Sequence, residues 1–173
     1  MAISSATIVA ALSAVQTGGN DFAGDKFAPS MRQTLSFTDG TTANKADILF
    51  TDQRAVATGA NDDIDLSGSL TDTFGTTVTA AEMVALVIIN APISGSANTT
   101  DLTIGGGSNP YIGFFGASGD TIGPIKPGGV FMLAAGDAAG IGTVTAGTAD
   151  ILRVSNSSGA TANYQIGFLA RTA

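Results

Sequence analysis

Short stretches in which apolar and polar residues alternate recur along most of the chain, and turn-forming residues separate them. Leu35 and Phe37 alternate with polar neighbours before an Asp-Gly pair, and Ile64 and Leu66 alternate after a turn rich in Gly, Asn and Asp. Because successive side chains of a strand point to opposite faces, this pattern predicts strands with one buried face. Other strands of this kind are expected at residues 46–51, 102–104, 111–115, 130–133, 151–154 and 164–169.

The spacing of the turn signals indicates the fold class. They recur about every 8–15 residues, as in sandwiches, jelly rolls and barrels. A chain of 173 residues corresponds to about one domain. We therefore expect an all-β protein in which residues 31–173 form a single β-sandwich or jelly-roll-like body.

The segment from residue 79 to residue 89 departs from strict alternation. Thr79 and Glu82 have the spacing of a helix capping box, whereas residues 84–89 are apolar, nearly continuous and rich in β-branched side chains. A continuous apolar run is typical of a strand that is buried on both faces. We expect at most a helical turn that leads into a central, doubly buried strand.

The N-terminal segment, residues 1–30, has a different pattern. Ile8, Leu12 and Val15 fall at positions i, i+4 and i+7, with Ser residues before them and a Gly pair after them. This spacing predicts a short amphipathic helix, too short to be stable alone, followed by a linker at residues 24–30. We expect an arm that becomes ordered when its three apolar side chains pack against another surface. A frayed terminus is the alternative.

The composition supports the β prediction and limits the partners. Ala, Gly, Thr and Ser make up about half of the chain, and a single Glu stands against thirteen Asp, which favours strands and turns over helix surfaces. The net charge is −7, and no basic residue lies between Arg54 and Lys126. Without a basic patch we expect no nucleic-acid partner. The acidic middle serves solubility or docking onto a basic surface.

The missing residue types exclude much of catalytic chemistry. The chain contains no Cys, no His and no Trp, so it lacks thiol nucleophiles, disulfides and the commonest general base and metal ligand. Ser, Lys and Asp residues form no recognisable catalytic constellation, and we expect a protein that is not an enzyme and needs no cofactor. A β-fold hydrolase that uses Asp72, Glu82 or Asp120 is a remaining hypothesis.

One acidic segment is a weak candidate for a metal site. Asp62, Asp63 and Asp65 place three carboxylates within four residues, and carboxylate oxygens are the ligands that Ca²⁺ prefers. The segment lacks the Gly and the distal Glu of a calcium-binding helix-loop-helix site. A solvated turn that enters a strand is the alternative interpretation.

No stretch of the sequence predicts a membrane segment. The longest apolar run, residues 83–89, is far shorter than the ~20 residues that cross a bilayer. The N-terminus is apolar but lacks the basic residues of a signal peptide. We expect a protein that is made in a cytoplasm and has no membrane partner.

Three stretches resemble small structural proteins of tailed bacteriophage virions, of the kind that bind the head as decoration or cement proteins. They are Leu66-Ser-Gly-Ser-Leu-Thr-Asp-Thr-Phe-Gly75, Pro127-Gly-Gly-Val-Phe-Met-Leu133 and Val144-Thr-Ala-Gly-Thr-Ala-Asp-Ile-Leu-Arg-Val-Ser-Asn156. The resemblance covers roughly residues 60–173, and because these stretches are turn and strand segments, no functional residue is carried over.

The resemblance implies a non-catalytic protein on the capsid surface, made in the host cytoplasm. It implies a β-sandwich or jelly-roll body and a homo-oligomer, a trimer or pentamer, bound to the major capsid protein. The alternative hypothesis is a receptor- or carbohydrate-binding module of a phage tail fibre or head turret. The low aromatic content, 6% of the residues, makes that alternative the second choice.

Overall fold

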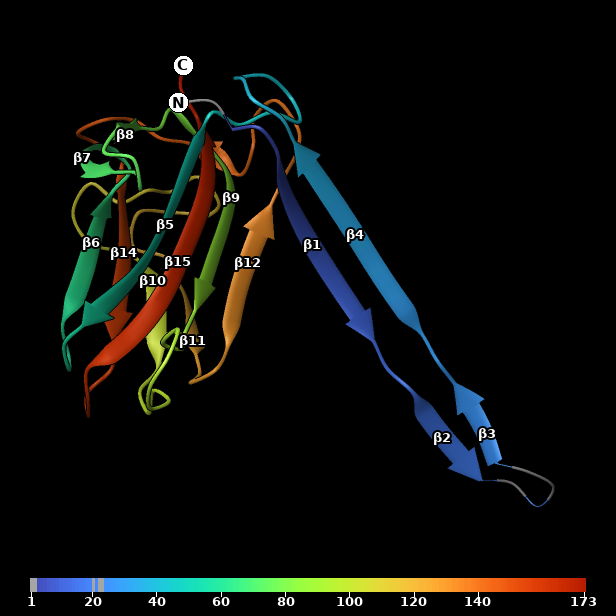
Figure 1. Ribbon diagram of the computed structural model, residues 1–173. Helices are drawn as coiled ribbons and strands as arrows, with labels where there is room; N and C mark the ends of the chain where they lie inside the picture. Colours follow the sequence, from blue (N-terminus) through green and yellow to red (C-terminus); the bar gives the residue numbers. More distant parts are fainter. Residues whose placement is uncertain (1–2, 20, 22–23) are drawn as a thin grey trace.

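The body of the protein is a sandwich of two antiparallel sheets (Figure 1). The computed structural model describes residues 3–19, 21 and 24–173, which form strands, turns and no helix. The arm-side sheet has the strand order β12-β9-β15-β5, and the second sheet has the order β11-β10-β14-β6. These strands are β5 (Ile48–Val56), β6 (Asn61–Asp65), β9 (Glu82–Ile89), β10 (Leu102–Gly105), β11 (Thr121–Ile125), β12 (Val130–Ala134), β14 (Ile151–Asn156) and β15 (Ala162–Arg171).

The eight body strands pair in a nested order. The first strand, β5, pairs with the last, β15; β6 pairs with β14, β9 with β12, and β10 with β11. The pairs β9–β15 and β10–β14 then join these four strand pairs into the two sheets. This nesting is the strand order of a jelly roll. The prediction of an all-β, sandwich or jelly-roll-like body is therefore confirmed.

The core lies between the two sheets and is built from alternating strand positions. Tyr164, Ile166 and Phe168 of β15 are buried on one face, as their spacing in the sequence predicts. Phe168 stacks on Phe50 of β5 with a ring-centroid distance of 5.0 Å. From the second sheet, Ile104 joins the same cluster. Alternation thus explains how both sheets bury one face each.

Strand β9 is central and its first half is buried on both faces, as the continuous apolar run predicts, whereas Val87 and Ile89 in its second half are only partly buried. Residues 83–86 are all buried. The expected helical turn before it is absent, since Thr79 ends the short strand β8 (Thr77–Thr79), which pairs with β7 (Ser67–Thr71). The backbone N–H of Ala81 donates to the carbonyl of Arg171. Long-range pairing therefore prevails over the local capping pattern.

Residues 111–115 form a tight turn segment rather than the predicted strand. The N–H of Tyr111 donates to the carbonyl of Ile151, and its hydroxyl donates to the carbonyl of Ile141 at 3.2 Å. A Cβ on Gly113 would lie 2.3 Å from the Tyr111 hydroxyl oxygen, so the backbone here folds too closely for an extended ladder. The small strand β13 (Gly142–Thr143) packs beside this turn and pairs with β9.

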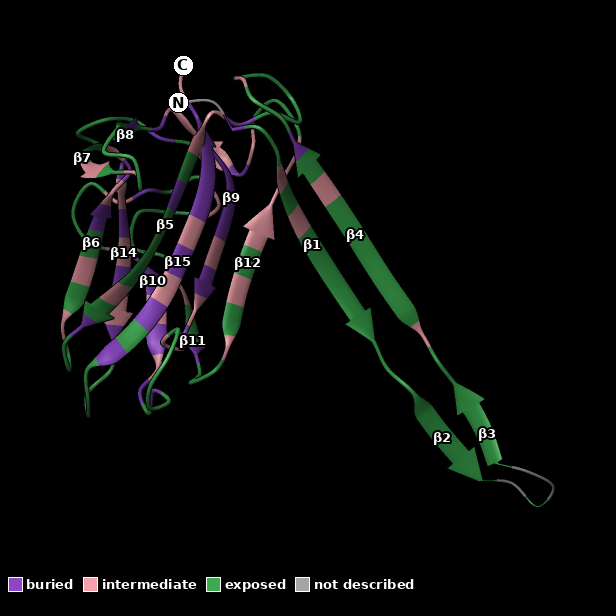
Figure 2. Cartoon of the chain, viewed as in Figure 1, coloured by how far each residue is buried: buried purple, intermediate pink, exposed green. Residues whose placement is uncertain are grey.

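The N-terminal arm is a long β-hairpin that extends away from the body (Figure 1). Strand β1 (Ala6–Ser13) pairs with β4 (Ser30–Phe37), and β2 (Gln16–Gly19) pairs with β3 (Gly24–Phe27). Figure 2 shows that the hairpin is exposed over almost its whole length. Residues 1, 2, 20, 22 and 23, which also belong to the expected arm, lie outside the described residues.

The predicted helix at the start of the chain is wrong. The apolar side chains at Ile8 and Leu12 also fit a period of two, and β-branched residues such as Thr7 and Val9 favour an extended backbone. Residues 24–30, which were expected to be a linker, form β3 and the start of β4, and the returning strand continues to Phe37, beyond the expected boundary at residue 30. Pairing with β4 determines the extended conformation of β1, and the i, i+4, i+7 spacing of the apolar residues does not indicate this pairing.

None of the described residues forms a helix that is long and apolar enough to cross a membrane.

We expect the body and the arm to differ sharply in their sensitivity to truncation. Phe168→Ala should lower the free energy of unfolding by about 3–5 kcal/mol because it opens a cavity in the core. Leu12→Ala, at an exposed position of the arm, should change it by less than about 0.5 kcal/mol. Urea unfolding of the two variants at low protein concentration measures both values, and equal losses would contradict the assignment of the core.

Candidate interaction surface

The arm has one apolar face and one mainly polar face. Directly opposed residues of an antiparallel pair lie on the same face. The rows of the apolar face are Ala6 with Phe37, Ile8 with Leu35, Ala10 with Gln33 and Leu12 with Met31. On the other face, Thr7, Val9, Ala11 and Ser13 oppose Ser36, Thr34, Arg32 and Ser30. The arm is therefore an amphipathic hairpin rather than an amphipathic helix.

Only the base of this apolar face is covered within the chain. Ile8 and Leu35 pack against a small cluster that includes Ala85 of β9 and Leu169 of β15. Farther along the arm, 58% of Leu12 and 69% of Met31 is exposed. Of the three side chains predicted to make contacts, Ile8 lies at the base, and Leu12 and Val15 lie on the exposed part.

Two more large apolar residues extend the exposed surface toward the tip. Val15, in the connection between β1 and β2, is 66% exposed, and Phe27 at the end of β3 is 65% exposed. Isolated exposed apolar residues are common on proteins. A series of them along one narrow hairpin is the feature that marks an interaction site.

A second apolar surface lies on the face of the arm-side sheet that points away from the core, here called the outer face. Its residues form three rows across β12, β9, β15 and β5: Ala134, Ala85, Leu169 and Leu49; Met132, Val87, Gly167 and Thr51; and Val130, Ile89, Gln165 and Gln53. The base of the arm covers the centre of the first row, where Ala85 and Leu169 are buried. Ile8 also borders the second row, where it lines a small pocket with Thr51, Val87 and Gly167. Beyond this pocket the second and third rows remain open, and Val130 is 60% exposed.

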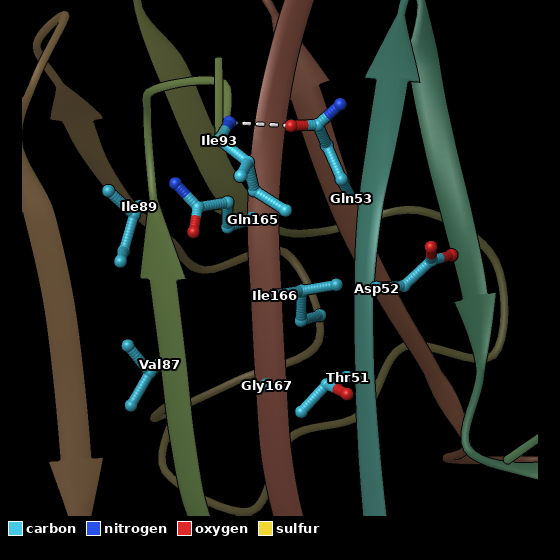
Figure 3. Close-up of a pocket in the computed structure, with 9 residues that line it drawn as sticks. All are labelled: Thr51, Asp52, Gln53, Val87, Ile89, Ile93, Gln165, Ile166 and Gly167. Carbon is cyan, nitrogen blue, oxygen red and sulfur yellow. Dashed lines mark hydrogen bonds between the residues drawn. The ribbon is translucent and has the colours of Figure 1, made fainter. Parts of the chain in front are cut away.

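The open rows contain a shallow hollow of about 470 Å³. Figure 3 shows Val87 and Ile89 of β9 on one side of it and Thr51 and Gln53 of β5 on the other, with Gly167 of β15 between them. Because Gly167 has no side chain, the centre of the floor is low. Such a hollow is suited to an apolar side chain from outside.

A short loop stands at one end of the hollow. The N–H of Ile93 donates to Oε1 of Gln53 at 2.6 Å (Figure 3), and the Ile93 side chain is exposed. The amide of Gln165 donates to the carbonyl of Ala91 at 3.1 Å in the same loop. These two glutamine contacts hold an exposed apolar side chain at the rim of the hollow.

Each of the three aspartates considered as a calcium site binds a different partner within the protein. Asp62 accepts hydrogen bonds from Arg54 at 2.7 Å and from the Tyr164 hydroxyl at 2.7 Å. Asp63 accepts from Arg153 at 2.6 and 2.7 Å, and Asp65 accepts from the N–H of Ser67. Because consecutive residues of a strand point to opposite faces, Asp62 lies on the opposite face of β6 from Asp63 and Asp65, and the latter two bind different partners. Within the described ranges, no group of three His, Cys, Asp or Glu side chains is arranged to hold a metal ion.

The acids of the hydrolase hypothesis also have separate partners. Asp72 accepts from the N–H groups of Phe74 and Thr76 in a turn, and Asp120 accepts from the N–H of Ala117 in another turn. Glu82 forms an ion pair with the buried Arg171 at 3.0 Å. Each carboxylate organises its own local structure.

Comparisons of the chain with protein-family models, with curated proteins and with solved structures find no match. The candidate site is therefore defined by the geometry of this chain.

The sequence indicates one half of this site and misses the other. The exposed side chains of the arm follow from its apolar spacing. The outer face was missed because β9 reads as a strand covered on both sides, and nothing in its apolar run distinguishes Ala85, which is covered, from Val87, which is not. Gly167 within an alternating strand pattern is the one available signal, since glycine in a strand interior marks a bulge or a close approach.

The ion pair on Asp62 is more buried than the neighbouring pair on Asp63. Burial alone would raise the pKa of Asp62, but hydrogen bonds from Arg54 and Tyr164 outweigh it and hold the pKa below its ordinary value of 3.8. The hydrogen bond from Arg153 lowers the pKa of Asp63, but that carboxylate is more exposed, with a side-chain exposure of 43% against 14%.

We expect Asp62→Asn to lower the free energy of unfolding at pH 7 by about 1.5–3 kcal/mol, because it removes charged hydrogen bonds from a partly buried site. Asp63→Asn, the matched control on the same strand, should cost less than about 1 kcal/mol. Because a depressed carboxyl pKa stabilises the fold only above the unfolded pKa, the Asp62→Asn deficit should shrink as the pH falls below about 4. Urea unfolding at pH 7 and at pH 3 tests this, and a deficit that grows in acid would refute it.

Proposed function

We propose that the protein is a structural component of a virion, a decoration or cement protein that forms a homo-oligomer and binds the major capsid protein. The arm is its attachment element. The observation that carries this proposal is the projecting hairpin, which presents Leu12, Val15, Phe27 and Met31 to solvent. An isolated two-stranded hairpin is only marginally stable in water, so an arm of this kind is suited to pairing with a second surface.

The distribution of charge supports an assembly role for the arm. Residues 1–37 contain two basic and two acidic residues, whereas residues 38–173 contain five basic and twelve acidic residues. The body therefore carries the whole net charge of −7, which keeps separate copies soluble through mutual repulsion. Because the arm has no net charge, it can approach the acidic body of another copy without electrostatic repulsion.

The fold and the sequence resemblance support the same role by analogy. Jelly rolls occur among viral capsid proteins, and also among lectins and cupins, so the fold by itself does not decide the function. The resemblance to phage head decoration proteins favours the capsid. Many weak contacts made by repeated copies on a lattice give high avidity without a single strong site.

The alternative function, a receptor- or carbohydrate-binding module, has less support. Sugar-binding sites generally use exposed aromatic rings. The rings of Phe114, Phe115 and Phe131 pack on one another and on the core. The exposed rings of Phe27 and Phe74 lie apart, one on the arm and one in the turn between β7 and β8.

A shortened arm tests the proposed function. Residues 11–32 are replaced by an Asn-Gly turn, which joins Ala10 to Gln33 with the turn chemistry of a two-residue hairpin and leaves the contacts of Ile8 and Leu35 in place. We expect the variant to keep the unfolding midpoint of the intact protein and to lose at least tenfold in affinity for undecorated capsids. Co-sedimentation with such capsids measures the loss.

The matched control is Thr7→Ala with Ser36→Ala, a pair on the polar face of the arm, which should leave capsid binding unchanged. Undiminished binding by the shortened variant would refute the role of the arm. Specific binding to glycans together with no binding to capsids would support the alternative function instead.

A further inference from the structure

We propose that the arm of one copy binds the outer face of the arm-side sheet of a second copy, with Leu12 and Met31 over the hollow at Gly167. This inference rests on the proposed function, because it names the partner of the attachment element. It makes the arm the contact through which the homo-oligomer forms.

The first support is that the contact already exists in part within one chain. Ile8 and Leu35 on the apolar face of the arm pack against the cluster that contains Ala85 and Leu169 of the first row, and Ile8 lines a small pocket with these two residues. The open rows of the outer face continue directly from that contact on the same strands. The exposed part of the arm likewise continues from Ile8 on the same face of the hairpin. The apolar face of the arm and the outer face of the sheet thus pack together at the base of the arm, and each continues as an uncovered apolar surface.

The second support is that the arm cannot close this contact within its own chain. Figure 1 shows β1 and β4 diverging from β12 and β9 toward the tip of the arm. The ladder between β1 and β4 runs without interruption from Ala6 to Ser13, so no irregularity in it bends the arm back onto the body. The open rows are therefore available to the arm of another copy.

The third support is the complementarity of shape. Leu12 and Met31 are direct cross-strand partners, so their side chains together form a single apolar protrusion from the hairpin. Gly167, which has no side chain, lines the hollow between Val87 on one side and Thr51 on the other (Figure 3). Met adapts its shape to an irregular apolar surface because its side chain is flexible. The two apolar side chains of the arm therefore fit a hollow to which Gly167 contributes no side chain.

The fourth support is the charge of the two surfaces. The three rows of the outer face contain no Asp, Glu, Lys or Arg, and the arm is neutral as a whole. Asp52, which also lines the hollow, is paired with Arg54 at 3.2 Å. A contact between two bodies would bring two negatively charged surfaces together. A contact between a neutral arm and a body would not. Electrostatics thus favours arm-to-body association over body-to-body association.

Engineered cysteines provide a direct test, because the chain has no cysteine of its own. Leu12→Cys protein is mixed with an equal amount of Val87→Cys protein and oxidised gently. A disulfide between the two different variants forms only when the arm of one copy reaches the outer face of another. The control mixture pairs Leu12→Cys with Thr121→Cys, an exposed position on the second sheet.

We expect at least tenfold more cross-linked heterodimer with Val87→Cys than with Thr121→Cys. Equal yields from the two mixtures, or a Leu12→Cys homodimer as the main product, would overturn the inference. The second result would mean that arms pair with arms, and the proposed function would survive it. The proposed function is tested by a different experiment, and it would be refuted if the variant with the shortened arm bound capsids as tightly as the intact protein.

A second variant tests the same contact without cysteines. Gly167→Val fills the hollow, and it is compatible with the strand because a Cβ at this position lies 3.6 Å from its nearest neighbour, the Thr51 methyl. We expect the dissociation constant of self-association, measured by sedimentation equilibrium, to rise at least tenfold. Gly119→Val, at a position with open space around its Cβ, is the matched control. Unchanged or tighter self-association of Gly167→Val would contradict the role of the hollow, since added apolar surface alone would strengthen a non-specific contact.

Discussion

The packing of the arm base onto the outer face of the arm-side sheet is the contact on which the rest of the structure depends. Ile8 and Leu35 pack against the cluster that contains Ala85 and Leu169, so β9 is buried on both sides at this end, and the hairpin gains a support that two strands cannot provide alone. Because the contact involves only the base, it leaves two matching apolar surfaces open, one along the arm and one across the sheet. The jelly-roll body provides the rigid support for both.

This division between a neutral arm and an acidic body suits a protein that must remain soluble before it assembles. The four ion pairs that join strands or loops of the body engage Arg54, Lys126, Arg153 and Arg171, so much of the body's positive charge is already used in the fold and the excess negative charge faces solvent. Repulsion between bodies then opposes random aggregation, while each arm offers a modest apolar contact that becomes strong when many copies act together.

The fold could be predicted from the sequence wherever one face of a strand is buried, because alternation then records the burial. This holds for β15, where Tyr164, Ile166 and Phe168 share the core face, and for the first half of β9, which is buried on both faces, but not for its second half, where the apolar run continues although the outer face is open. It fails where the partner decides the outcome. The spacing of Ile8 and Leu12 fits a helix as well as a strand, and only pairing with β4 resolves it. The turn at Tyr111 and the hollow at Gly167 depend on close contacts between distant segments, which local patterns do not record.

The central claim is that the exposed arm is completed by the outer face of a neighbouring copy. Electron cryo-microscopy of the assembled oligomer, free or on the capsid, tests this most directly. We expect density for each arm to lie across β12, β9 and β15 of an adjacent copy, with Leu12 and Met31 above Gly167. Arms that extend into solvent, or that contact only the capsid while the outer face of every copy stays uncovered, would contradict the account.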